Sequence, residues 1–463
     1  MGDATGKAAV ILTAPDLLAR SARSLAVNVA LMRAFRRSPI DFLDVLVDSG
    51  AGTVPLRMGP ERVLLVADPT QVWELLTTHG RRTGKGRGLV RARLLLGQGL
   101  LTSEGEAHLQ HRRALQPAFH TQRIADYLAH FAGAARRAAD RWSDGGDIDL
   151  VAEMSAMTLD GAATALFGSD LRAAAPQITR ALTNLLAGFR LAMAPGGSAL
   201  LRSPLPVAIR VRVAKAELET VVDDLIRGRW AGEFPPGPVL ELLASQPEFS
   251  DGQARDEVMT LLLAGHETTA MALTWALAAI DQTPAVRADL QAEWDAKRES
   301  LPAAELAEAL PLTTAVLAET LRLWPPSWMF SRRVLEPVVL GGRTVPVGTM
   351  CLISPALLHR DPRSWAEPER FQPDRWLWRV QGKADRFDPK SPGQPRGAYL
   401  PFGAGPRMCI GEQFAWSEAA TMLAELGRTW RLRVHDTPLT AGRSSMTLRP
   451  NSPVHATTWH RRS

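Results

Sequence analysis

The stretch from Asp256 to Ile280 constrains the fold more than any other, because it is the longest candidate helix and is apolar nearly all round. A helix of this kind runs through the interior of a protein rather than along its surface. A polar island from Gly265 to Thr269 lies inside it. Glycine weakens a helix, and a buried glutamate is costly. Local conflicts of this kind tend to mark functional sites. We therefore expect a buried central helix with a functional site at residues 265–269.

A second segment, Phe402 to Gly411, holds one of only two cysteines, with three glycines around it and Arg407 two residues before it. This pattern predicts a tight loop whose backbone amides point at the sulfur. Amide donors and a bound cation both favour the thiolate over the thiol. A lone thiolate cannot build a zinc knuckle or an iron–sulfur cluster, which need several ligands, but it suits one axial position on haem iron. The alternative is a buried cysteine in a glycine-rich turn, the commoner fate of a lone cysteine.

Both segments resemble signatures of the cytochrome P450 family. The cysteine segment reproduces the haem-binding pattern F-x-x-G-x-R-x-C-x-G at Phe402, Gly405, Arg407, Cys409 and Gly411. The island, taken from Ala264 to Thr269, resembles the family's acid–alcohol pair, which lies in a central helix above the haem. The resemblance extends from about Thr53 to the C-terminus, and five fixed positions within ten residues make chance an unlikely source.

The resemblance implies a mainly α fold with a small β region, in which haem b (iron protoporphyrin IX) lies between the long central helix and the cysteine loop. It implies an N-terminal extension and first helix over residues 1–52, and one haem-binding monooxygenase domain over residues 53–463. The sequence departs from the family pattern at two places, neither of which is among the candidate catalytic or cofactor-binding residues. The segment Leu377 to Gln394 is longer and more polar than the family's compact version, and Pro337 stands where an acidic residue often falls.

The resemblance also assigns catalytic roles within the island. Gly265 leaves room for dioxygen and can let the helix bulge. Thr268 would hydrogen-bond the oxygen, and Glu267 would relay protons from solvent. Each residue has an alternative when taken alone: Glu267 could be a structural ion-pair carboxylate, and the Thr268 hydroxyl could bond to the preceding turn.

The candidate cofactor contacts follow from the same resemblance. Haem carries two propionates, which need cations or strong donors. His108 stands where the family's W-x-x-x-R helix has tryptophan, and Arg112 lies on the same helical face; a metal site at His108 and His111 would lack a third ligand. With Cys409 as the metal ligand, the cofactor-binding candidates are His108, Arg112, Arg332 (with Arg333 as an alternative), Arg407, Phe402, Gly405, Gly411, Ala264 and Gly265.

A structural ion network is expected on the cysteine side of the haem. Glu319 and Arg322 lie one helical turn apart, a common pairing that is strengthened by the Leu323-Trp324-Pro325-Pro326 sequence that follows and ends the helix. In the family a later arginine completes a buried network of three residues. Of Arg370 and Arg375, we choose Arg375.

The substrate pocket can be placed only by resemblance. Its walls would include Leu100, Leu261, Trp328, Met329, Phe330 and Met446, with Ser445 beside the last. This mostly aliphatic lining favours a hydrophobic substrate such as a terpenoid, a fatty acyl chain or a macrocycle. Arg87, Arg91 and Arg93 could instead grip a carboxylate, although exposed arginines on a loop are the simpler interpretation.

Local patterns predict several further elements. A hairpin is expected at 54–58 and 62–66 around Gly59-Pro60, followed by a helix that Asp68 caps and that runs to Leu76. Apolar spacing predicts helices over 126–142, 149–167 and 214–230. Cys351 lies in an apolar run and is expected to be a small buried hydrophobe.

Composition restricts the function classes. The net charge of +6 could suggest nucleic acid, but the arginines are scattered with no aromatic-interleaved basic array. No apolar run approaches the roughly 18 residues that a membrane-spanning helix needs, and the N-terminus lacks a secretory pattern. We therefore expect a soluble, cytoplasmic bacterial protein, taken to be a monomer, without a nucleic-acid partner.

Together these features predict a haem-thiolate monooxygenase. It would insert one oxygen atom of O2 into a C–H bond or alkene of a hydrophobic small molecule, in specialised metabolism. Because the haem domain uses all the length, electrons would come from separate proteins, a ferredoxin and its reductase. Arg112, Arg113 and Arg407 are candidate steering charges for an acidic ferredoxin. The alternatives are a peroxide-driven peroxygenase and a non-catalytic haem-thiolate sensor or binding protein.

Overall fold

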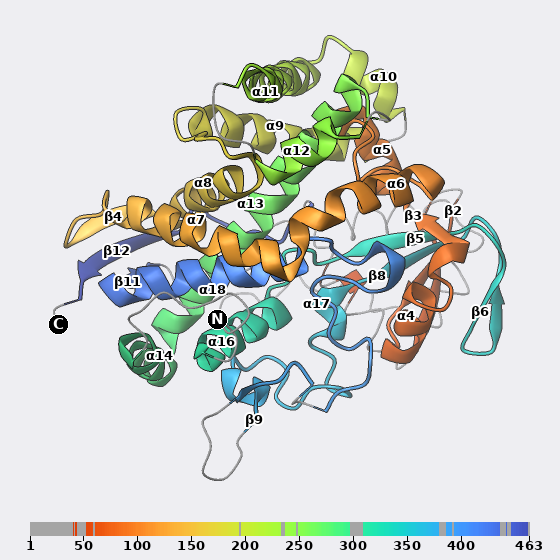
Figure 1. The fold of residues 1–463 in the computed structure, drawn as a ribbon. Coiled ribbons are helices and arrows are strands. Elements are labelled where there is room, and N and C mark those ends of the chain that lie inside the picture. The colour runs from red at the N-terminus through yellow and green to blue at the C-terminus, as the bar shows by residue number, and fades with distance from the viewer. Residues whose placement is uncertain are drawn as a thin grey trace, which may run out of the picture.

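The computed structural model describes residues 40, 42–43, 52–58, 61–193, 196–232, 237–246, 249–296, 309–378, 386–390, 393–435, 441 and 446–461. Figure 1 shows helices packed around one another on one side and a small sheet on the other. The mainly α fold with a small β region is confirmed. The boundary at residue 52 stays a prediction, because nearly all of residues 1–52 and the Gly59-Pro60 turn lie outside the described ranges.

The helices and strands have the following bounds in chain order. The α-helices are α4 (Pro69–Leu76), α5 (Arg87–Leu96), α6 (Gly105–Leu115), α7 (Thr121–Ala139), α8 (Leu150–Phe167), α9 (Ala175–Met193), α10 (Gly197–Arg202), α11 (Pro206–Trp230), α12 (Pro238–Ala244), α13 (Asp251–Gln282), α14 (Pro284–Ala296), α16 (Pro311–Leu323), α17 (Pro355–Leu358) and α18 (Glu412–Thr429). The strands are β1 (Thr53–Met58), β2 (Glu61–Val66), β3 (Thr83–Lys85), β4 (Gly146–Asp149), β5 (Phe330–Val334), β6 (Val338–Leu340), β7 (Arg343–Val345), β8 (Met350–Ile353), β9 (Leu377–Trp378), β10 (Arg386–Phe387), β11 (Trp430–Val434) and β12 (His455–His460). Short 3₁₀ turns are η1 (Gly80–Arg82), η2 (Gln116–Phe119), η4 (Pro373–Trp376) and η5 (Gly405–Arg407).

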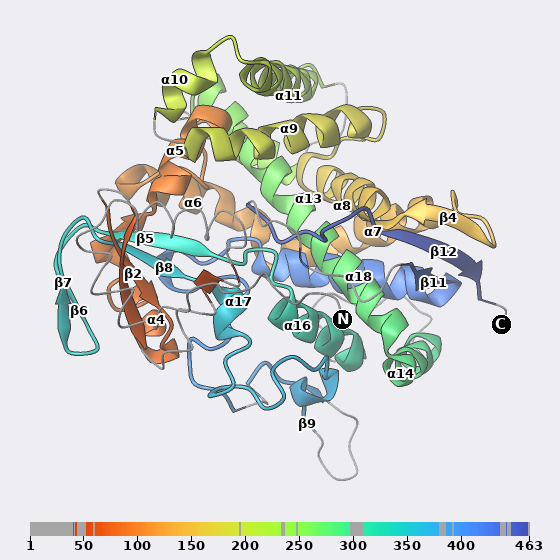
Figure 2. The same ribbon diagram turned by 180° about the vertical axis from the view of Figure 1, so that it is seen from behind.

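The central helix is α13, and it crosses the whole molecule (Figure 2). It packs against α8, α16 and α18, and most of its side chains are buried, as the apolar pattern predicted. It begins at Asp251 rather than Asp256 because Ser250 forms a capping box with Gln253, which satisfies the first free amides. The helix stays α-helical through Gly265, so the possible bulge there is not present.

Other helix starts follow local capping chemistry. Asp68 accepts a hydrogen bond from the amide of Gln71 at 2.9 Å and opens α4 as predicted, and Asp149 caps α8 in the same way. The helix expected over 214–230 is longer, because Pro206 occupies its first turn and starts α11 instead of only breaking the chain. Likewise α7 begins five residues before Asp126 and ends at Ala139, short of Trp142.

The main sheet holds the strands in the order β1-β2-β8-β5-β3. The predicted hairpin forms its edge, with β1 antiparallel to β2. Cys351 lies in β8, buried as expected, and burial raises the pKa of its thiol to about 12. At the other edge, β3 runs antiparallel to β5, and this register sets Lys85 directly opposite Arg332. The pairing of β3 with β5 therefore places the basic residues Lys85 and Arg332 side by side.

Among the described residues, one helix, α8, is long and apolar enough to span a membrane, and 72% of that stretch is buried inside the protein. Its side chains pack in the main hydrophobic core with those of α7, α13 and α18, and Figure 1 shows α7 and α18 lying side by side. α8 is therefore a core helix of this fold.

Candidate active site

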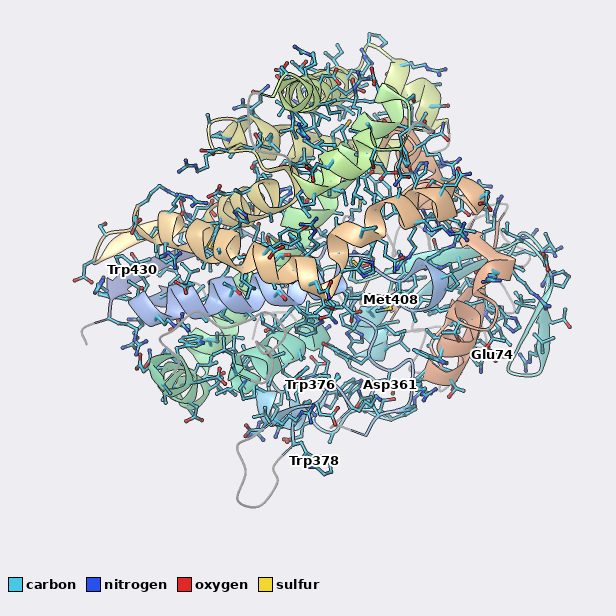
Figure 3. All side chains as sticks on the ribbon, in the orientation of Figure 1. Glu74, Asp361, Trp376, Trp378, Met408 and Trp430 are labelled. Carbon is cyan, nitrogen blue, oxygen red and sulfur yellow. The ribbon has the colours of Figure 1, made fainter. Side chains whose placement is uncertain are left out.

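The cysteine segment forms a tight loop directly before α18. The amide of Cys409 donates to the carbonyl of Phe402 at 2.9 Å, and the amide of Met408 donates to Gly405 at 3.0 Å. Gly405 has φ +72°, and a Cβ there would clash with the carbonyl oxygen of Leu76. Only glycine fits this conformation and this close approach, so the sequence pattern has a direct steric reason. Figure 3 places Met408, the neighbour of the cysteine, near the middle of the molecule.

The Cys409 thiol is accessible to a water-sized probe, yet protein surrounds it closely enough that burial raises its pKa to about 11. Glu412 acts in the same direction, whereas a hydrogen bond from the Gly411 amide and the charge of Arg112 lower the pKa. In the loop alone, burial outweighs the Gly411 amide and Arg112. A cation bound to the sulfur, the other part of the expectation, would favour the thiolate, so that expectation stays a prediction.

One face of α13 is accessible in the middle of an otherwise buried helix. Ala264 is exposed, and Gly265 and Thr268 are half-buried, while the residues before and after them are buried. Accessible surface at the centre of a core helix means that this face borders internal space. Thr268 Oγ1 donates to the carbonyl of Ala264 at 2.9 Å, which is the alternative considered for this hydroxyl. The hydroxyl nevertheless stays on the accessible face.

Glu267 points elsewhere, into a buried polar contact. Its carboxylate accepts hydrogen bonds from Thr447 at 2.5 Å and from Arg449 at 2.8 Å. The Glu267 side chain is 4% exposed and that of Arg449 is 36% exposed. The structure thus shows the ion pair that we considered as an alternative, and it links the buried carboxylate to a more exposed side chain. His266 is buried on another side, against the carbonyl of Leu262.

A cluster of basic side chains lies beside the cysteine loop. We call it the basic cluster; its members are Lys85, His108, Arg112, Arg332 and Arg407. Arg112 Nη1 donates to the carbonyl of Met408 at 2.7 Å, which ties α6 to the loop. Arg407 pairs with Glu104 at 2.9 Å. Glu104 is the carboxylate that faces the cluster within the described part of the chain.

The charges in the basic cluster oppose one another. Burial, together with Arg407, lowers the pKa of Lys85 to about 7 and that of Arg332 to about 10. Burial and the neighbouring Lys85 lower the pKa of His108 to about 3, so His108 is a neutral donor. Buried like charges are unfavourable unless an anion joins them.

These residues fit a haem. Its two propionates supply the negative charge that the basic cluster lacks, and Arg407 Nη1 is buried with no hydrogen-bond partner among the described residues. The accessible thiol of Cys409 suits its iron. The structure brings the predicted contacts His108, Arg112, Arg332 and Arg407 together, whereas Arg333 is exposed.

Sequence reasoning missed Lys85. It stands in the basic run Arg81 to Arg87, where each side chain could equally face solvent. Only the pairing of β3 with β5 shows that Lys85 is 5% exposed, with Nζ donating to the carbonyls of Leu100 at 2.7 Å and Ser103 at 2.6 Å. Arg87, by contrast, forms a half-exposed pair with Glu61.

The three residues of the expected ion network lie in contact. Arg322 donates to both oxygens of Glu319 at 2.8 Å, and Arg375 Nε lies 3.1 Å from Glu319 Oε1. Glu319 and Arg322 are both fully buried. The Arg370 side chain instead pairs with Glu367 at the surface. The geometry therefore favours Arg375 as the third member.

The candidate pocket residues differ in accessibility. Leu100, Leu261 and Trp328 are buried, whereas Met329, Phe330 and Met446 are half-buried; Ser445 lies outside the described residues. Leu101, next to Leu100, is half-buried too and has side-chain surface free to meet a ligand. The sequence alone does not tell which of the two adjacent leucines remains accessible.

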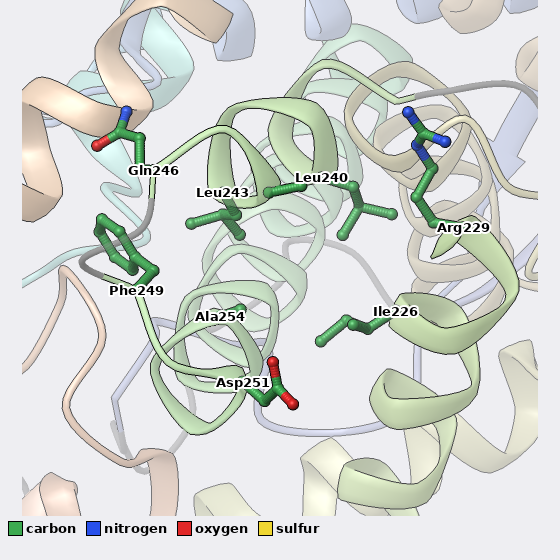
Figure 4. A pocket seen from close by; sticks show the side chains of 9 residues that line it. Ile226, Arg229, Leu240, Leu243, Gln246, Phe249, Asp251 and Ala254 are labelled. Carbon is green, nitrogen blue, oxygen red and sulfur yellow. The ribbon is translucent and has the colours of Figure 1, made fainter. Parts of the chain in front are cut away.

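A separate pocket of about 250 Å³ lies between the end of α11, α12 and the start of α13 (Figure 4). Its lining includes Ile226, Arg229, Leu240, Phe249 and Asp251. None of the candidate catalytic or cofactor-binding residues lines it. It is therefore distinct from the site built by Cys409 and Thr268.

Comparisons with known proteins agree with this site. The model of the family "Cytochrome P450" matches residues 36–457. Cyclooctat-9-en-7-ol 5-monooxygenase of Streptomyces melanosporofaciens is 38% identical over 409 residues, 86% of each chain. Pentalenene oxygenase of Streptomyces avermitilis is 32% identical over 406 residues, 86% of this chain and 88% of the relative. The crystal structure of the haem domain of a cytochrome P450DA mutant superposes with a TM-score of 0.77 at 26% identity, covering 91% of this chain and 93% of the other. With the family model matching most of its length, the chain belongs to the cytochrome P450 family.

Proposed function

We propose that this P450 monooxygenase inserts an oxygen atom of O2 into a C–H bond or alkene of a terpenoid. Two relatives carry the names of terpene oxygenases, and the half-buried candidates Leu101, Met329, Phe330 and Met446 are all apolar. A terpenoid is therefore a better match than a charged substrate. Neither a peroxygenase nor a haem-thiolate sensor is favoured, since the relatives are named as oxygenases.

The haem, when bound, supplies the activation of oxygen and the oxidation of the substrate. Cys409 would hold its iron, and the basic cluster would hold its propionates. Lys85, Arg332 and Arg407 provide charge, whereas His108 is neutral and donates only a hydrogen bond. The protein's part is to fix the plane and the orientation of the group between α13 and the loop.

Protons reach the accessible face of α13 by way of two side chains. Thr268 holds a proton on Oγ1, directed at the carbonyl of Ala264, and can turn it toward a ligand on that face. Glu267 is held by Arg449, whose side chain is 36% exposed and would give the carboxylate its route to solvent. Rotation of the Glu267 carboxylate away from Arg449 would bring it toward the Thr268 side of the helix. The ion pair that we considered as an alternative thus becomes the resting state of a relay.

Electrons would come from a ferredoxin and its reductase. Of the three arginines expected to steer an acidic ferredoxin, the surroundings of two argue against that role: Arg112 is half-buried and bonded to Met408, and Arg407 is paired with Glu104. Arg113 is exposed and remains the candidate. The bacterial relatives support a cytoplasmic location, where such partners occur.

Two accessible features carry this proposal: the Cys409 residue in its loop, and the face of α13 at Ala264 and Thr268. The test supplies reductase, ferredoxin and a panel of cyclic diterpene and sesquiterpene hydrocarbons and alcohols under ¹⁸O-labelled dioxygen. Products heavier by one labelled oxygen atom support the proposal. Oxidation of fatty acids alone would contradict the terpenoid assignment, and unlabelled products would contradict monooxygenation.

A further inference from the structure

The backbone of Leu100 is held from two sides by buried charged groups. Its amide donates to Glu257 Oε2 at 2.9 Å, and its carbonyl accepts from Lys85 Nζ at 2.7 Å. Glu257 comes from α13 and is fully buried, and Lys85 comes from β3 and is 5% exposed. Two secondary-structure elements that are distant in sequence therefore fix one peptide of the loop between α5 and α6.

Glu257 also has a close partner on α6. His111 Nδ1 of α6 lies 2.6 Å from Glu257 Oε1, and the His111 side chain is 6% exposed. The two atoms are close, although the contact does not meet the geometry of a well-directed hydrogen bond. The ring of Phe249 packs against His111 at 5.2 Å between centroids. A fully buried carboxylate is costly without polar partners, and the Leu100 amide and the His111 ring are two such partners of Glu257.

The same loop meets α13 very closely. The amide of Gln98 donates to Asp256 at 2.7 Å, and a Cβ on Gly99 would clash with the Thr260 hydroxyl. The segment can therefore shift only if its bonds to α13 are released. Leu101, directly after the held peptide, is half-buried and so keeps apolar side-chain surface that a ligand can meet, whereas Leu100 is buried.

We propose that Glu257, which His111 contacts, is a positioning residue that sets the size of the substrate space by fixing the Leu100–Leu101 segment. This inference rests on the proposed function, because it takes the loop as one wall of the substrate pocket. Glu257 and His111 do not touch the substrate or the haem in this scheme. They act through the backbone of the loop, so their removal changes which ligands fit and not whether the iron is bound.

Azoles test this without knowledge of the natural substrate, since they bind haem iron and report a spectral shift. Imidazole is small, so its dissociation constant reports access to the iron alone. Clotrimazole is bulky, so its dissociation constant also depends on the pocket walls. Glu257→Leu removes the acceptor for the Leu100 amide. We expect the ratio of the clotrimazole and imidazole dissociation constants to change about tenfold, the effect of one charged hydrogen bond. Glu257→Gln keeps an acceptor and should change the ratio less, about threefold.

The matched control is Asp160→Asn. Asp160 is also a mostly buried carboxylate in an ion pair, with Arg137 at 2.8 Å, but it lies on α8. This variant should leave the azole ratio unchanged. Leu101→Ala provides a second control, because the Glu257→Leu change should shrink to under about twofold once that side chain is gone.

Hydrogen exchange of the peptide covering residues 97–104 gives an independent readout that needs no haem. Exchange should be faster in Glu257→Leu and in His111→Phe than in wild type and Asp160→Asn. Parallel changes in both azole affinities, additive effects of Glu257→Leu and Leu101→Ala, or unchanged exchange in both variants would each overturn the inference. If the wild type showed no azole shift at all, the haem assignment would fail instead, and the exchange rates alone would decide whether Glu257 holds the loop.

Discussion

Lys85 and Arg332 lie directly opposite each other on the antiparallel strands β3 and β5, and both are nearly buried. Like charges at directly opposed positions destabilise a sheet. In this register the cationic side chains of Lys85 and Arg332 repel each other, and an anion bound between them would reduce that repulsion. The basic cluster therefore suits carboxylates, and haem brings two of them.

Lys85 gives a testable pH dependence. Its folded pKa is about 7, below the ordinary value of 10.5, so between these pH values the unfolded chain binds more protons than the folded one. Stability of haem-free protein should therefore rise with pH from about 7 to 10.5, by a few kcal/mol in all, of order 1.4 kcal/mol per pKa unit. Denaturant titrations of wild type and Lys85→Met across this range measure the difference. Equal slopes in the two proteins would contradict the lowered pKa, and haem should flatten the wild-type slope.

Thr268→Ala should separate oxygen consumption from product formation. Without the hydroxyl, proton delivery fails and reducing equivalents are lost to peroxide, so product per O2 should fall about tenfold or more. Haem content and the carbon monoxide spectrum should not change. Thr274→Ala is the matched control, since its buried hydroxyl also donates to the carbonyl four residues before it, at 2.8 Å on the same helix. Equal coupling in Thr268→Ala and wild type would refute the role of the hydroxyl.

Arg375 should matter for stability far more than Arg370. Arg375→Met leaves the fully buried Glu319 carboxylate short of one partner and should lower the free energy of unfolding by about 2–4 kcal/mol. Arg370→Met removes an exposed pair with Glu367 and should cost under about 1 kcal/mol. Guanidinium unfolding of both variants tests this. Similar losses would show that Arg375 is not part of the network.

Arg113→Glu should slow reduction by ferredoxin at low salt. An exposed cation that steers an acidic partner raises the association rate, and salt screens the effect. Stopped-flow reduction at low and high ionic strength measures it. Arg433→Glu, an exposed arginine on β11, is the control and should leave the rate unchanged. A rate equally insensitive to both substitutions would place the docking surface elsewhere.

The sequence best predicted those residues whose role depends on their neighbours along the chain. The loop before Cys409 depends on Gly405, which a close backbone approach requires, and Glu319 with Arg322 lie one turn apart on a helix. Lys85 could not be found in this way, because its burial depends on a strand pairing across more than two hundred residues. The Glu104–Arg407 pair is equally distant in sequence, which is why Arg407 was taken for a steering charge. The burial that raises the pKa of the Cys409 thiol could not be predicted either, since burial is a property of the whole fold.

The central claim, a Cys409 thiolate on haem iron, is tested most directly by the absorption spectrum of the reduced protein under carbon monoxide. Wild type and Cys351→Ala should both show the strongly red-shifted Soret band of thiolate ligation, and Cys409→Ala should lose it. A wild-type protein loaded with haem but lacking that band, or a Cys409→Ala variant with an identical spectrum, would contradict the account.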